Sequence, residues 1–255
     1  MNLDQVKAVI TGGASGLGQA TAARLAAAGA AVALLDVQDE AGRKAAGAIG
    51  AQASYHRCDV TDESAVDAAD RVAAGRMGGL NLAVSCAGVA TPGKLLGKDG
   101  PLASSAFQRV MDINVLGTFL LDRAAAAIMQ GNAPDADGER GLLIHTASVA
   151  AFEGQIGQVA YATSKAAVAG MVLPLARELA RFGIRVVGIA PGIFGTPMMS
   201  GLPQEAQDSL GKQVPFPPRL GRPDEYAELV AAVVTNRMLN GDTIRLDGAI
   251  RMAPR

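Results

Sequence analysis

The stretch that decides the fold is Thr11-Gly12-Gly13-Ala14-Ser15-Gly16-Leu17-Gly18. It directly follows the short apolar segment Val6–Ile10, which predicts a strand, and it opens the helical pattern Gly16–Ala28. Glycines let the backbone turn tightly and approach a pyrophosphate, whose charge then meets the N-terminus of the next helix. Because this loop lies between a strand and a helix, it predicts nucleotide binding rather than a purely structural turn.

The rest of the chain alternates short apolar runs with longer helical patterns. The apolar or β-rich runs predict strands buried on both faces of a sheet: Val6–Ile10, Ala31–Leu35, Ala53–Arg57, Leu82–Ser85, Leu142–Thr146, Val186–Ile189 and Thr243–Leu246. The helical patterns are Gly16–Ala28, Asp62–Ala74 with Thr61 as its N-cap, Ala103–Met129, Tyr161–Phe182 and Pro223–Thr235. This alternation predicts one α/β domain over residues 1–255, a Rossmann-type doubly wound parallel sheet with helices on both faces.

Composition excludes several classes of protein. Lys+Arg 23 against Asp+Glu 24, no Trp and 4% aromatic residues leave neither a basic footprint nor stacking platforms for nucleic acid. The first apolar segment begins only five residues in, which leaves no room for a signal or transit peptide. No uninterrupted apolar run reaches the ~18 residues needed to span a bilayer. We therefore expect a cytoplasmic protein that does not contact membranes. The 31 glycines are an excess, about 12% of the chain against a usual ~7%.

The two cysteines and two histidines predict no catalytic or metal site. Cys58 and Cys86 lie in apolar contexts without metal-ligand spacing and are expected to be buried thiols, although the sequence alone leaves a disulfide open. His56 and His145 have no Ser or Cys partner at hydrolase spacing and are expected to be structural. HxxxH patterns and clustered carboxylates are absent from the sequence, so no metal is expected.

Asp36 ends the second predicted strand, 18 residues after Gly18. An acid at this place accepts hydrogen bonds from the adenosine ribose hydroxyls and repels a 2′-phosphate. Neither Val37 nor Gln38 brings a positive charge for that phosphate. The sequence therefore favours NAD over NADP as the cofactor.

Tyr161 and Lys165 are four residues apart at the start of a helical pattern, so they share one face of that helix. A tyrosine is a poor base at neutral pH, and a nearby ammonium favours its phenolate. Ser148 ends the fifth predicted strand, 13 residues before Tyr161, where its hydroxyl can hold a substrate oxygen. The three residues predict a general acid–base site for a hydroxyl/carbonyl couple.

Together these motifs resemble the short-chain dehydrogenase/reductase family from about residue 5 to 252. The resemblance also covers Asp59-Val60, Ala87-Gly88, Asn114, Pro191-Gly192 and Thr196. It implies a sheet of about seven strands, with Tyr161 as acid–base, Ser148 positioning the substrate oxygen, and Lys165 lowering the tyrosine pKa and binding the nicotinamide ribose.

The same resemblance assigns the remaining residues. Asn114 would hold a water in the proton relay, and Asp59 and Val60 would flank the adenine. Ala87 and Gly88 would line the cofactor, while Pro191, Gly192 and Thr196 would contact its nicotinamide end. A homotetramer is implied, with the helices of Asn114 and Tyr161 at the interface. One departure is Ser85-Cys86-Ala87-Gly88 where the family has Asn-Asn-Ala-Gly, which puts local strand pairing in doubt.

Within the family, several stretches look closest to the type 2 3-hydroxyacyl-CoA dehydrogenases, also described as hydroxysteroid dehydrogenases. These are Val9–Gly18, Thr146–Gly157, Ala190–Pro197, Gln213–Gly221 and Ile244–Met252. The resemblance implies oxidation of (S)-3-hydroxyacyl-CoA to 3-oxoacyl-CoA by NAD, with substrate loops near residues 91–105 and 193–215.

The sequence leaves two possible roles open for residues of these loops. Lys94 and Lys98 could meet CoA phosphates or be ordinary solvated lysines. Phe194, Met198, Met199 and Leu202 could line an apolar cleft or belong to the core.

Three alternatives remain at this stage. A 3-oxoacyl-carrier-protein reductase has the same Ser–Tyr–Lys set, but Asp36 argues against its NADPH. A hydroxysteroid or short-chain alcohol dehydrogenase shares every residue named above. A non-catalytic NAD-binding scaffold would have lost Ser148, Tyr161 or Lys165, and all three are present.

Overall fold

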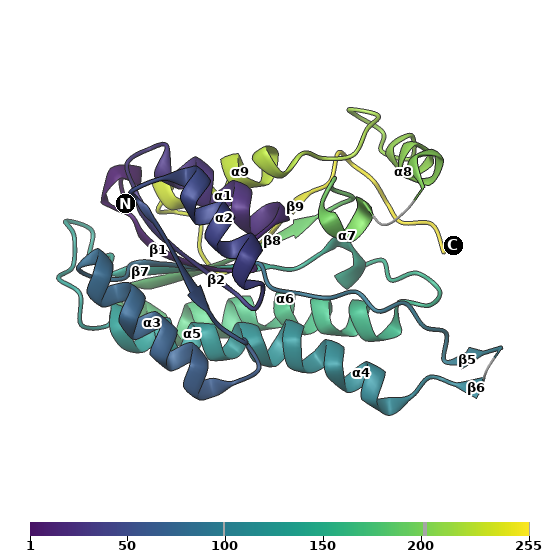
Figure 1. Ribbon diagram of the computed structural model, residues 1–255, viewed down its shortest axis with the longest axis horizontal. Helices are drawn as coiled ribbons and strands as arrows, with labels where there is room; N and C mark the ends of the chain where they lie inside the picture. The colour runs from purple at the N-terminus through teal and green to yellow at the C-terminus, as the bar shows by residue number, and fades with distance from the viewer. Residues whose placement is uncertain (99, 201–202, 255) are drawn as a thin grey trace.

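A computed structural model describes residues 1–98, 100–200 and 203–254. Its centre is a seven-stranded sheet in which every neighbouring pair of strands is parallel (Figure 1). In spatial order the strands are β3 (Ala53–Arg57), β2 (Ala31–Asp36), β1 (Lys7–Thr11), β4 (Leu82–Ser85), β7 (Gly141–Thr146), β8 (Ile184–Pro191) and β9 (Thr243–Leu246). The predicted fold class is therefore confirmed.

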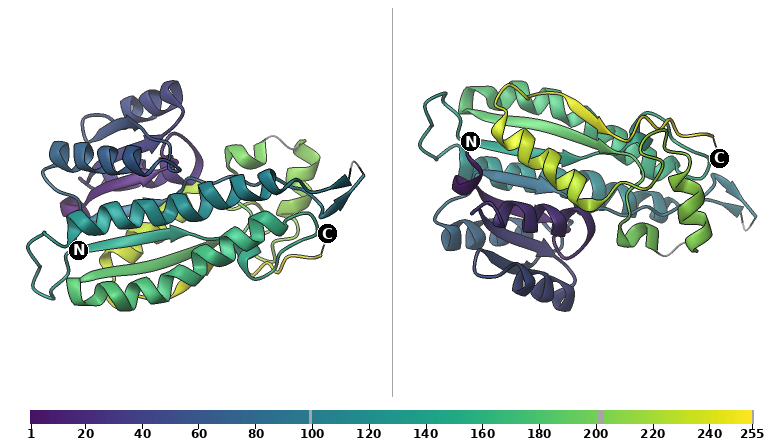
Figure 2. Two further views of the ribbon diagram at one scale, coloured as in Figure 1. Left: turned by 90° about the horizontal axis from the view of Figure 1, so that it is seen from below. Right: turned by 90° about the horizontal axis from the view of Figure 1, so that it is seen from above.

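Helices cover both faces of this sheet (Figure 2). On one face lie α1 (Gly16–Ala26), α2 (Asp39–Ile49) and α9 (Pro223–Thr235), and on the other α3 (Glu63–Met77), α4 (Ser104–Met111), α5 (Gly117–Met129) and α6 (Val159–Leu179). The strands are buried on both faces because alternate side chains enter two separate apolar clusters. Ile10 packs in the α1–α9 cluster and Val9 packs in the α3–α5–α6 cluster.

The strand order reverses between β1 and β4. From β1 the chain moves outward through β2 and β3, and it then crosses to β4 and the other half of the sheet. In open parallel sheets, the crevice at such a switch point, beyond the carboxyl ends of the strands, is where ligands bind. The loop from Thr11 to Gly18, residue Asp36 and the Ser85–Gly88 segment all leave the sheet at this end.

The strand predictions are accurate, and the unusual Ser85-Cys86 segment does not disturb pairing. Ser85 pairs in register with Thr11 and with His145, and the Cys86 N–H still donates to the Thr11 carbonyl at 3.2 Å. The predicted strand Val186–Ile189 is longer than expected and runs over Ile184–Pro191.

Two helix predictions need correction. The pattern Ala103–Met129 is not one helix, because a π-helical turn over Asp112–Leu116 separates α4 from α5. The N-cap of α3 is Asp62 and not Thr61, since the Asp62 carboxylate accepts from the N–H groups of Ser64 and Ala65.

Helix α2 has no counterpart in the predictions. Gly42 and Gly47 weaken its helical signal. Gly42 is required by packing, since a Cβ there would lie 2.1 Å from the ring of Tyr55.

The insertions after β4 and before β7 are exposed, as expected. The first forms a small antiparallel hairpin of β5 (Leu96–Gly97) and β6 (Gly100–Pro101) at one end of the molecule (Figure 1). Two further helices, α7 (Pro197–Ser200) and α8 (Gln204–Gly211), lie in the second predicted substrate loop.

One helix, Val159–Phe182, is long and apolar enough by length and composition alone to cross a membrane. It comprises α6 and a short 3-10 extension, and it lies along the sheet packed against β8. Core helices pass the same test, and this helix carries Tyr161 and Lys165.

Candidate active site

The loop after β1 brings its glycines against backbone from two other segments. Gly12 has a φ of +64°, and a Cβ there would lie 2.8 Å from the backbone of Cys86 and Ala87. A Cβ on Gly18 would lie 2.4 Å from the Gly12 carbonyl oxygen. Ser15 begins α1 without capping it through its side chain, and Gly16 and Leu17 form the first turn. This tight loop against a helix N-terminus fits a pyrophosphate group.

Asp36 lies beside this loop, as predicted. One oxygen of its carboxylate accepts from the N–H of Ala14 at 3.1 Å, and the other accepts from the N–H of Gln38 at 3.1 Å. The side chain is largely buried, while Val37 and Gln38 are exposed. A negative charge is thus held at the end of β2, next to the loop.

The residues expected around the adenine and along the cofactor lie on the same edge of the sheet. Asp59 accepts from the N–H and hydroxyl of Thr61, and these bonds lower its pKa. Val60 is buried against Gly117. The N–H of Ala87 donates to the Thr11 hydroxyl at 3.3 Å.

Gly88 joins this cradle to the catalytic residues. A Cβ on Gly88 would lie 3.2 Å from Asn114 Oδ1 and 3.6 Å from Lys165 Nζ. A larger residue would therefore crowd both side chains. Two residues expected in different roles thus flank one glycine.

Pro191 is the last residue of β8, and Gly192 follows it. The N–H of Gly192 donates to the Leu246 carbonyl, and a Cβ there would lie 2.9 Å from Asp247 Cα. Thr196 lies across from the glycine loop, since its Cβ is 3.5 Å from where a Cβ on Gly16 would be. A predicted cofactor residue from the second half of the chain therefore lies beside the glycine loop from its start.

Lys165 is buried at the carboxyl end of β7. Its Nζ donates to the Thr146 carbonyl at 2.6 Å and lies 5.9 Å from the centre of the Tyr161 ring. Burial lowers the pKa of Lys165 to about 8. The ammonium therefore remains the main form at neutral pH.

Tyr161 and Ser148 are brought together at the same place. Burial raises the pKa of Tyr161, and a hydrogen bond with the Ser148 hydroxyl partly offsets this rise. Of these two effects on the tyrosine pKa, burial is the larger. The Ser148 oxygen also accepts from the N–H of Ala150 at 3.1 Å. The phenol is accordingly protonated at neutral pH and can act as an acid.

Asn114 is buried in the π-helical turn between α4 and α5. Its side chain accepts from the Val89 N–H at 2.8 Å and donates to the Val89 carbonyl and to Ser164 Oγ. Ser164 in turn donates to the Tyr161 carbonyl at 2.7 Å. Asn114 is thus joined through one hydroxyl to the backbone of the tyrosine.

Sequence reasoning missed three residues that support this group. Ser164 lies inside the Tyr161–Lys165 motif and Thr146 ends the strand before Ser148, so both had a local signal. Tyr226 had none, because it comes from α9 on the opposite face of the sheet, 80 residues after Thr146.

The candidate apolar cleft is only partly supported. Phe194 is buried in the α1–α9 cluster and packs against Gly221, so it belongs to the core. Met199 is half-buried. Leu202 and the side chain of Met198 lie outside the part of the chain that the structure describes.

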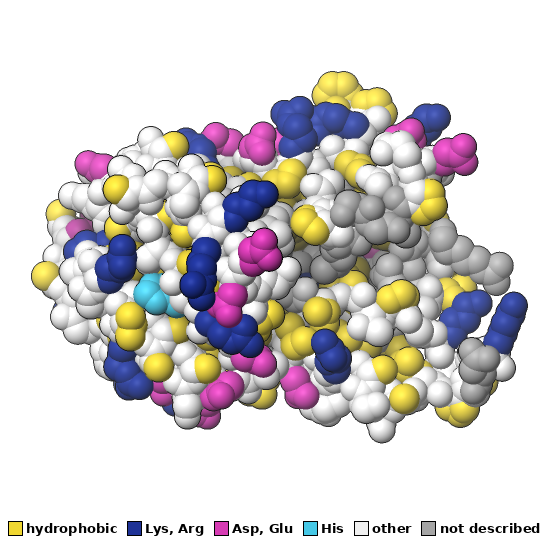
Figure 3. All heavy atoms as spheres, viewed as in Figure 1, with side chains coloured by type: hydrophobic (Ala, Val, Ile, Leu, Met, Phe, Trp, Pro, Cys, Tyr) yellow, Lys and Arg dark blue, Asp and Glu magenta, His cyan; other side chains and the backbone are white. Residues whose placement is uncertain are grey.

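Lys94 and Lys98 are exposed on the segment that carries the β5–β6 hairpin. Lys or Arg side chains stand at that end of the molecule in the space-filling view (Figure 3). The N–H of Gly93 donates to the Gly157 carbonyl at 2.8 Å, which ties the first insertion to the loop after Ser148.

The cysteines and histidines do not form a group with metal-ligand geometry in the part of the chain that the structure describes. Both cysteines are free thiols, with Cys58 buried and Cys86 half-buried. His145 is buried with Nε2 at 2.8 Å from Asp122, and His56 lies 3.0 Å from Ser54 Oγ. Over residues 1–98, 100–200 and 203–254, no three His, Cys, Asp or Glu residues are grouped as a metal ion would require.

Comparisons with known proteins show the family of this chain. The family model "short chain dehydrogenase" matches residues 6–207. The chain is 52% identical over 249 residues to 3-hydroxyacyl-CoA dehydrogenase type-2 of Homo sapiens, covering 97% of this chain and 95% of the human protein. It is 50% identical over 248 residues to the protein of that name from Drosophila melanogaster, covering 96% and 97%.

A solved structure is also similar. It is the crystal structure of 3-hydroxyacyl-CoA dehydrogenase type-2 from Mycobacterium avium, with a TM-score of 0.93 and 40% sequence identity, covering 98% of this chain and 97% of that one. The match extends over the whole sheet and its helices. The chain is an oxidoreductase that belongs to the short chain dehydrogenase family.

Proposed function

We propose that this enzyme interconverts (S)-3-hydroxyacyl-CoA and 3-oxoacyl-CoA, with NAD as the hydride carrier. The observation that carries the proposal is the position of Tyr161, Ser148 and Lys165 at the carboxyl end of β7, beside the glycine cradle. The substrate class is supported by relatives that are about half identical over nearly their whole length and carry that activity in their names.

The preference for NAD rests on Asp36. Its carboxylate is held against the glycine loop by the Ala14 N–H, where the adenosine ribose of a dinucleotide would lie. A 2′-phosphate at that place would meet a like charge with no Lys or Arg at Val37 or Gln38 to offset it. Bound in this cradle, the nicotinamide ring supplies or accepts the hydride.

The chain's own residues manage the proton and orient the substrate. In reduction, the Tyr161 hydroxyl donates its proton to the 3-oxo oxygen, and in oxidation the phenolate accepts it from the 3-hydroxyl group. The Ser148 hydroxyl donates a hydrogen bond to the same oxygen and holds it in reach of Tyr161. Lys165, anchored on Thr146, places a positive charge near the phenol and favours its ionised form as the proton leaves.

The assay is the change in NADH absorbance over acetoacetyl-CoA, longer 3-oxoacyl-CoAs and a panel of hydroxysteroids. We expect turnover of the CoA thioesters, faster with NADH than with NADPH. Tyr161→Phe should lower kcat by about 100-fold or more, since it removes the acid–base, while NADH binding persists. Activity on steroids or simple alcohols with none on any thioester would contradict the substrate class. Unchanged turnover in Tyr161→Phe would contradict the mechanism.

A second candidate substrate class is the hydroxysteroids, because the catalytic residues do not discriminate between the two classes. The exposed Lys94 and Lys98 favour a phosphate-bearing substrate such as CoA. We assign the substrate loops to residues 91–105 and 193–215, within a single domain. We expect Lys94→Ala and Lys98→Ala to leave the rates with hydroxysteroids unchanged, because these substrates carry no phosphate.

We also propose that the protein is a cytoplasmic homotetramer that does not bind nucleic acid or membranes. The apolar side chains of Leu116, Phe119 and Leu173 are exposed on the α5 and α6 side of the molecule. Packing those helices against a second copy would cover them. Sedimentation analysis should give the mass of four chains, and a monomer at assay concentration would contradict this assembly.

A further inference from the structure

Lys165 is linked to a tyrosine on the far side of the sheet through one residue. The Lys165 ammonium donates to the Thr146 carbonyl at 2.6 Å. The Thr146 hydroxyl lies 2.7 Å from the hydroxyl of Tyr226 and 3.5 Å from Cys86 Sγ. Lys165 comes from α6 on one face of the sheet and Tyr226 from α9 on the other, so Thr146 is held from both sides.

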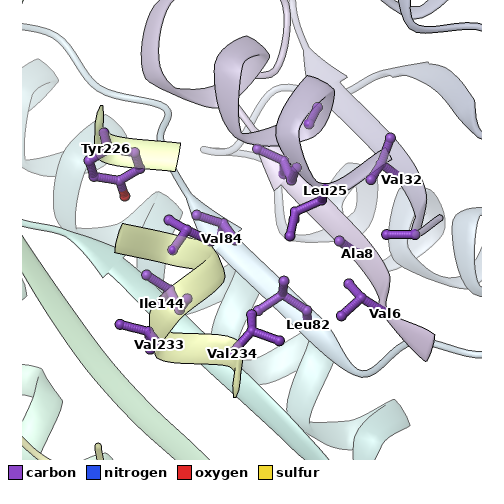
Figure 4. Close-up of a cluster of buried hydrophobic side chains, with 14 of the residues drawn as sticks. Val6, Ala8, Leu25, Val32, Leu82, Val84, Ile144, Tyr226, Val233 and Val234 are labelled. Carbon is purple, nitrogen blue, oxygen red and sulfur yellow. The ribbon is translucent and has the colours of Figure 1, made fainter. Parts of the chain in front are cut away.

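This chain of contacts is shielded from solvent. Tyr226 is 0% exposed, Lys165 6% and Thr146 8%. Figure 4 shows Tyr226 at one end of the cluster of buried apolar side chains. A hydroxyl in such surroundings is costly to leave without a partner, and Thr146 and Cys86 are the partners that the structure gives it.

Tyr226 does not act by changing its own charge. Burial raises its pKa well above its ordinary value, so the phenol stays neutral over the range in which the enzyme works. Its contribution is a hydrogen bond that restrains the end of β7. Thr146 is the last residue of that strand, two residues before Ser148.

We propose that Tyr226 is a positioning residue that holds Thr146 so that its carbonyl accepts the Lys165 ammonium. The proposal rests on the role given above to Lys165. Without the Tyr226 hydroxyl, the side chain of Thr146 would keep only the sulfur of Cys86, which is a weak hydrogen-bond partner. The carbonyl acceptor of Lys165 would then be less well placed, and the charged form of the lysine would lose stabilisation.

The test compares Tyr226→Phe with Val233→Ala. The first removes one buried oxygen and keeps the ring; the second opens a cavity in the same helix and the same apolar cluster. NMR titration of protein labelled at lysine Cε gives the pKa of Lys165, whose signal is identified by its loss in Lys165→Met.

In Tyr226→Phe we expect this pKa to fall below about 8 by about 0.5–1 unit. We expect kcat to fall about tenfold with the KM for acetoacetyl-CoA unchanged. Val233→Ala should leave both the lysine pKa and kcat unchanged.

Thr146→Val removes the same hydrogen bond from the other side. We expect the double variant with Tyr226→Phe to be no worse than the more severe single variant, because both remove one interaction. An unchanged Lys165 pKa, or losses in kcat that multiply in the double variant, would overturn the proposal. If Tyr226→Phe does not fold, the titration of Thr146→Val decides, with an unchanged pKa again overturning it. A wild-type enzyme without activity on acetoacetyl-CoA would refute the proposed function, whereas the titration needs no substrate and would still decide on Tyr226.

Discussion

The backbone N–H of Ala14 donates a hydrogen bond to the side chain of Asp36 across 3.1 Å. This contact joins the phosphate-binding loop to the end of β2, although the two residues are 22 positions apart. It fixes the carboxylate before any ligand arrives. The acid proposed to select the cofactor and the loop proposed to hold it are therefore joined before any ligand binds.

Removing the charge of Asp36 should relax the choice between NADH and NADPH. Asp36→Asn keeps an oxygen for the Ala14 N–H but no longer repels a 2′-phosphate. We expect the ratio of kcat/KM for NADPH to that for NADH to rise about 10–100-fold. Steady-state kinetics with both cofactors measures it. Asp39→Asn, three residues on and outside the cradle, should leave the ratio unchanged, and an equal ratio in both variants would count against Asp36.

The glycine cradle should tolerate no side chain at Gly18. A Cβ there would lie 2.4 Å from the Gly12 carbonyl, a backbone atom that cannot move without displacing the loop. Gly18→Ala should therefore weaken NADH binding at least tenfold, as measured by the fluorescence of the bound cofactor. The matched control is Gly47→Ala in α2, where a Cβ meets nothing within 4 Å. That change should raise stability by about 0.5–1 kcal/mol and leave binding intact. If Gly18→Ala and Gly47→Ala bound NADH equally well, the loop would accommodate a Cβ at Gly18, which would contradict this prediction.

Asp70 should make the protein less stable as the pH rises. Its side chain is 0% exposed on α3, and neither of its oxygens has a hydrogen-bond partner among the residues that the structure describes. Burial raises its pKa to about 8. An unfolded aspartate ionises near pH 3.9, so the unfolded state gives up this proton first. The destabilisation therefore grows from about pH 4 up to about pH 8, where the folded carboxyl also ionises.

Asp70→Asn removes this pH-dependent cost. At pH 8 the variant should have a free energy of unfolding higher than that of wild type by on the order of a few kcal/mol, and it should therefore unfold at a higher temperature. The two proteins should converge near pH 4. Thermal unfolding at several pH values measures the difference. Glu40→Gln, at an exposed carboxylate, should follow wild type throughout. A wild type that is more stable than Asp70→Asn at pH 8 would mean that the carboxylate has a partner.

The local signals for the catalytic group were strong because its parts are close along the chain or end neighbouring strands. Tyr161 and Lys165 share one helical turn, and Ser148 follows a strand whose carboxyl end lies at the crevice. Parallel topology alone brings such strand ends to one edge. The predicted site residues therefore meet in the structure without any knowledge of side-chain packing.

Other features depended on packing between distant segments. Gly42 reads as a helix breaker, yet it is required where α2 crosses Tyr55. The sequence is equally compatible with Phe194 in an apolar cleft or in the core. In the structure it packs in the α1–α9 cluster and therefore belongs to the core.

The sequence by itself determined the parallel sheet, the nucleotide loop, the acid at Asp36 and the membership of the catalytic group. Each of these follows from periodicity or spacing within a short stretch, where local geometry decides which residues share a face. Only the tertiary structure decided that Asp70 is buried with no hydrogen-bond partner in residues 1–98, 100–200 and 203–254, and that Tyr226 reaches Thr146 through the sheet. Those contacts join residues with no shared periodicity, so they exist only once helices from both faces have packed on the strands. The glycines show both cases. A side chain at Gly18 would clash with its own loop, whereas one at Gly88 would crowd Asn114, which the fold brings to it.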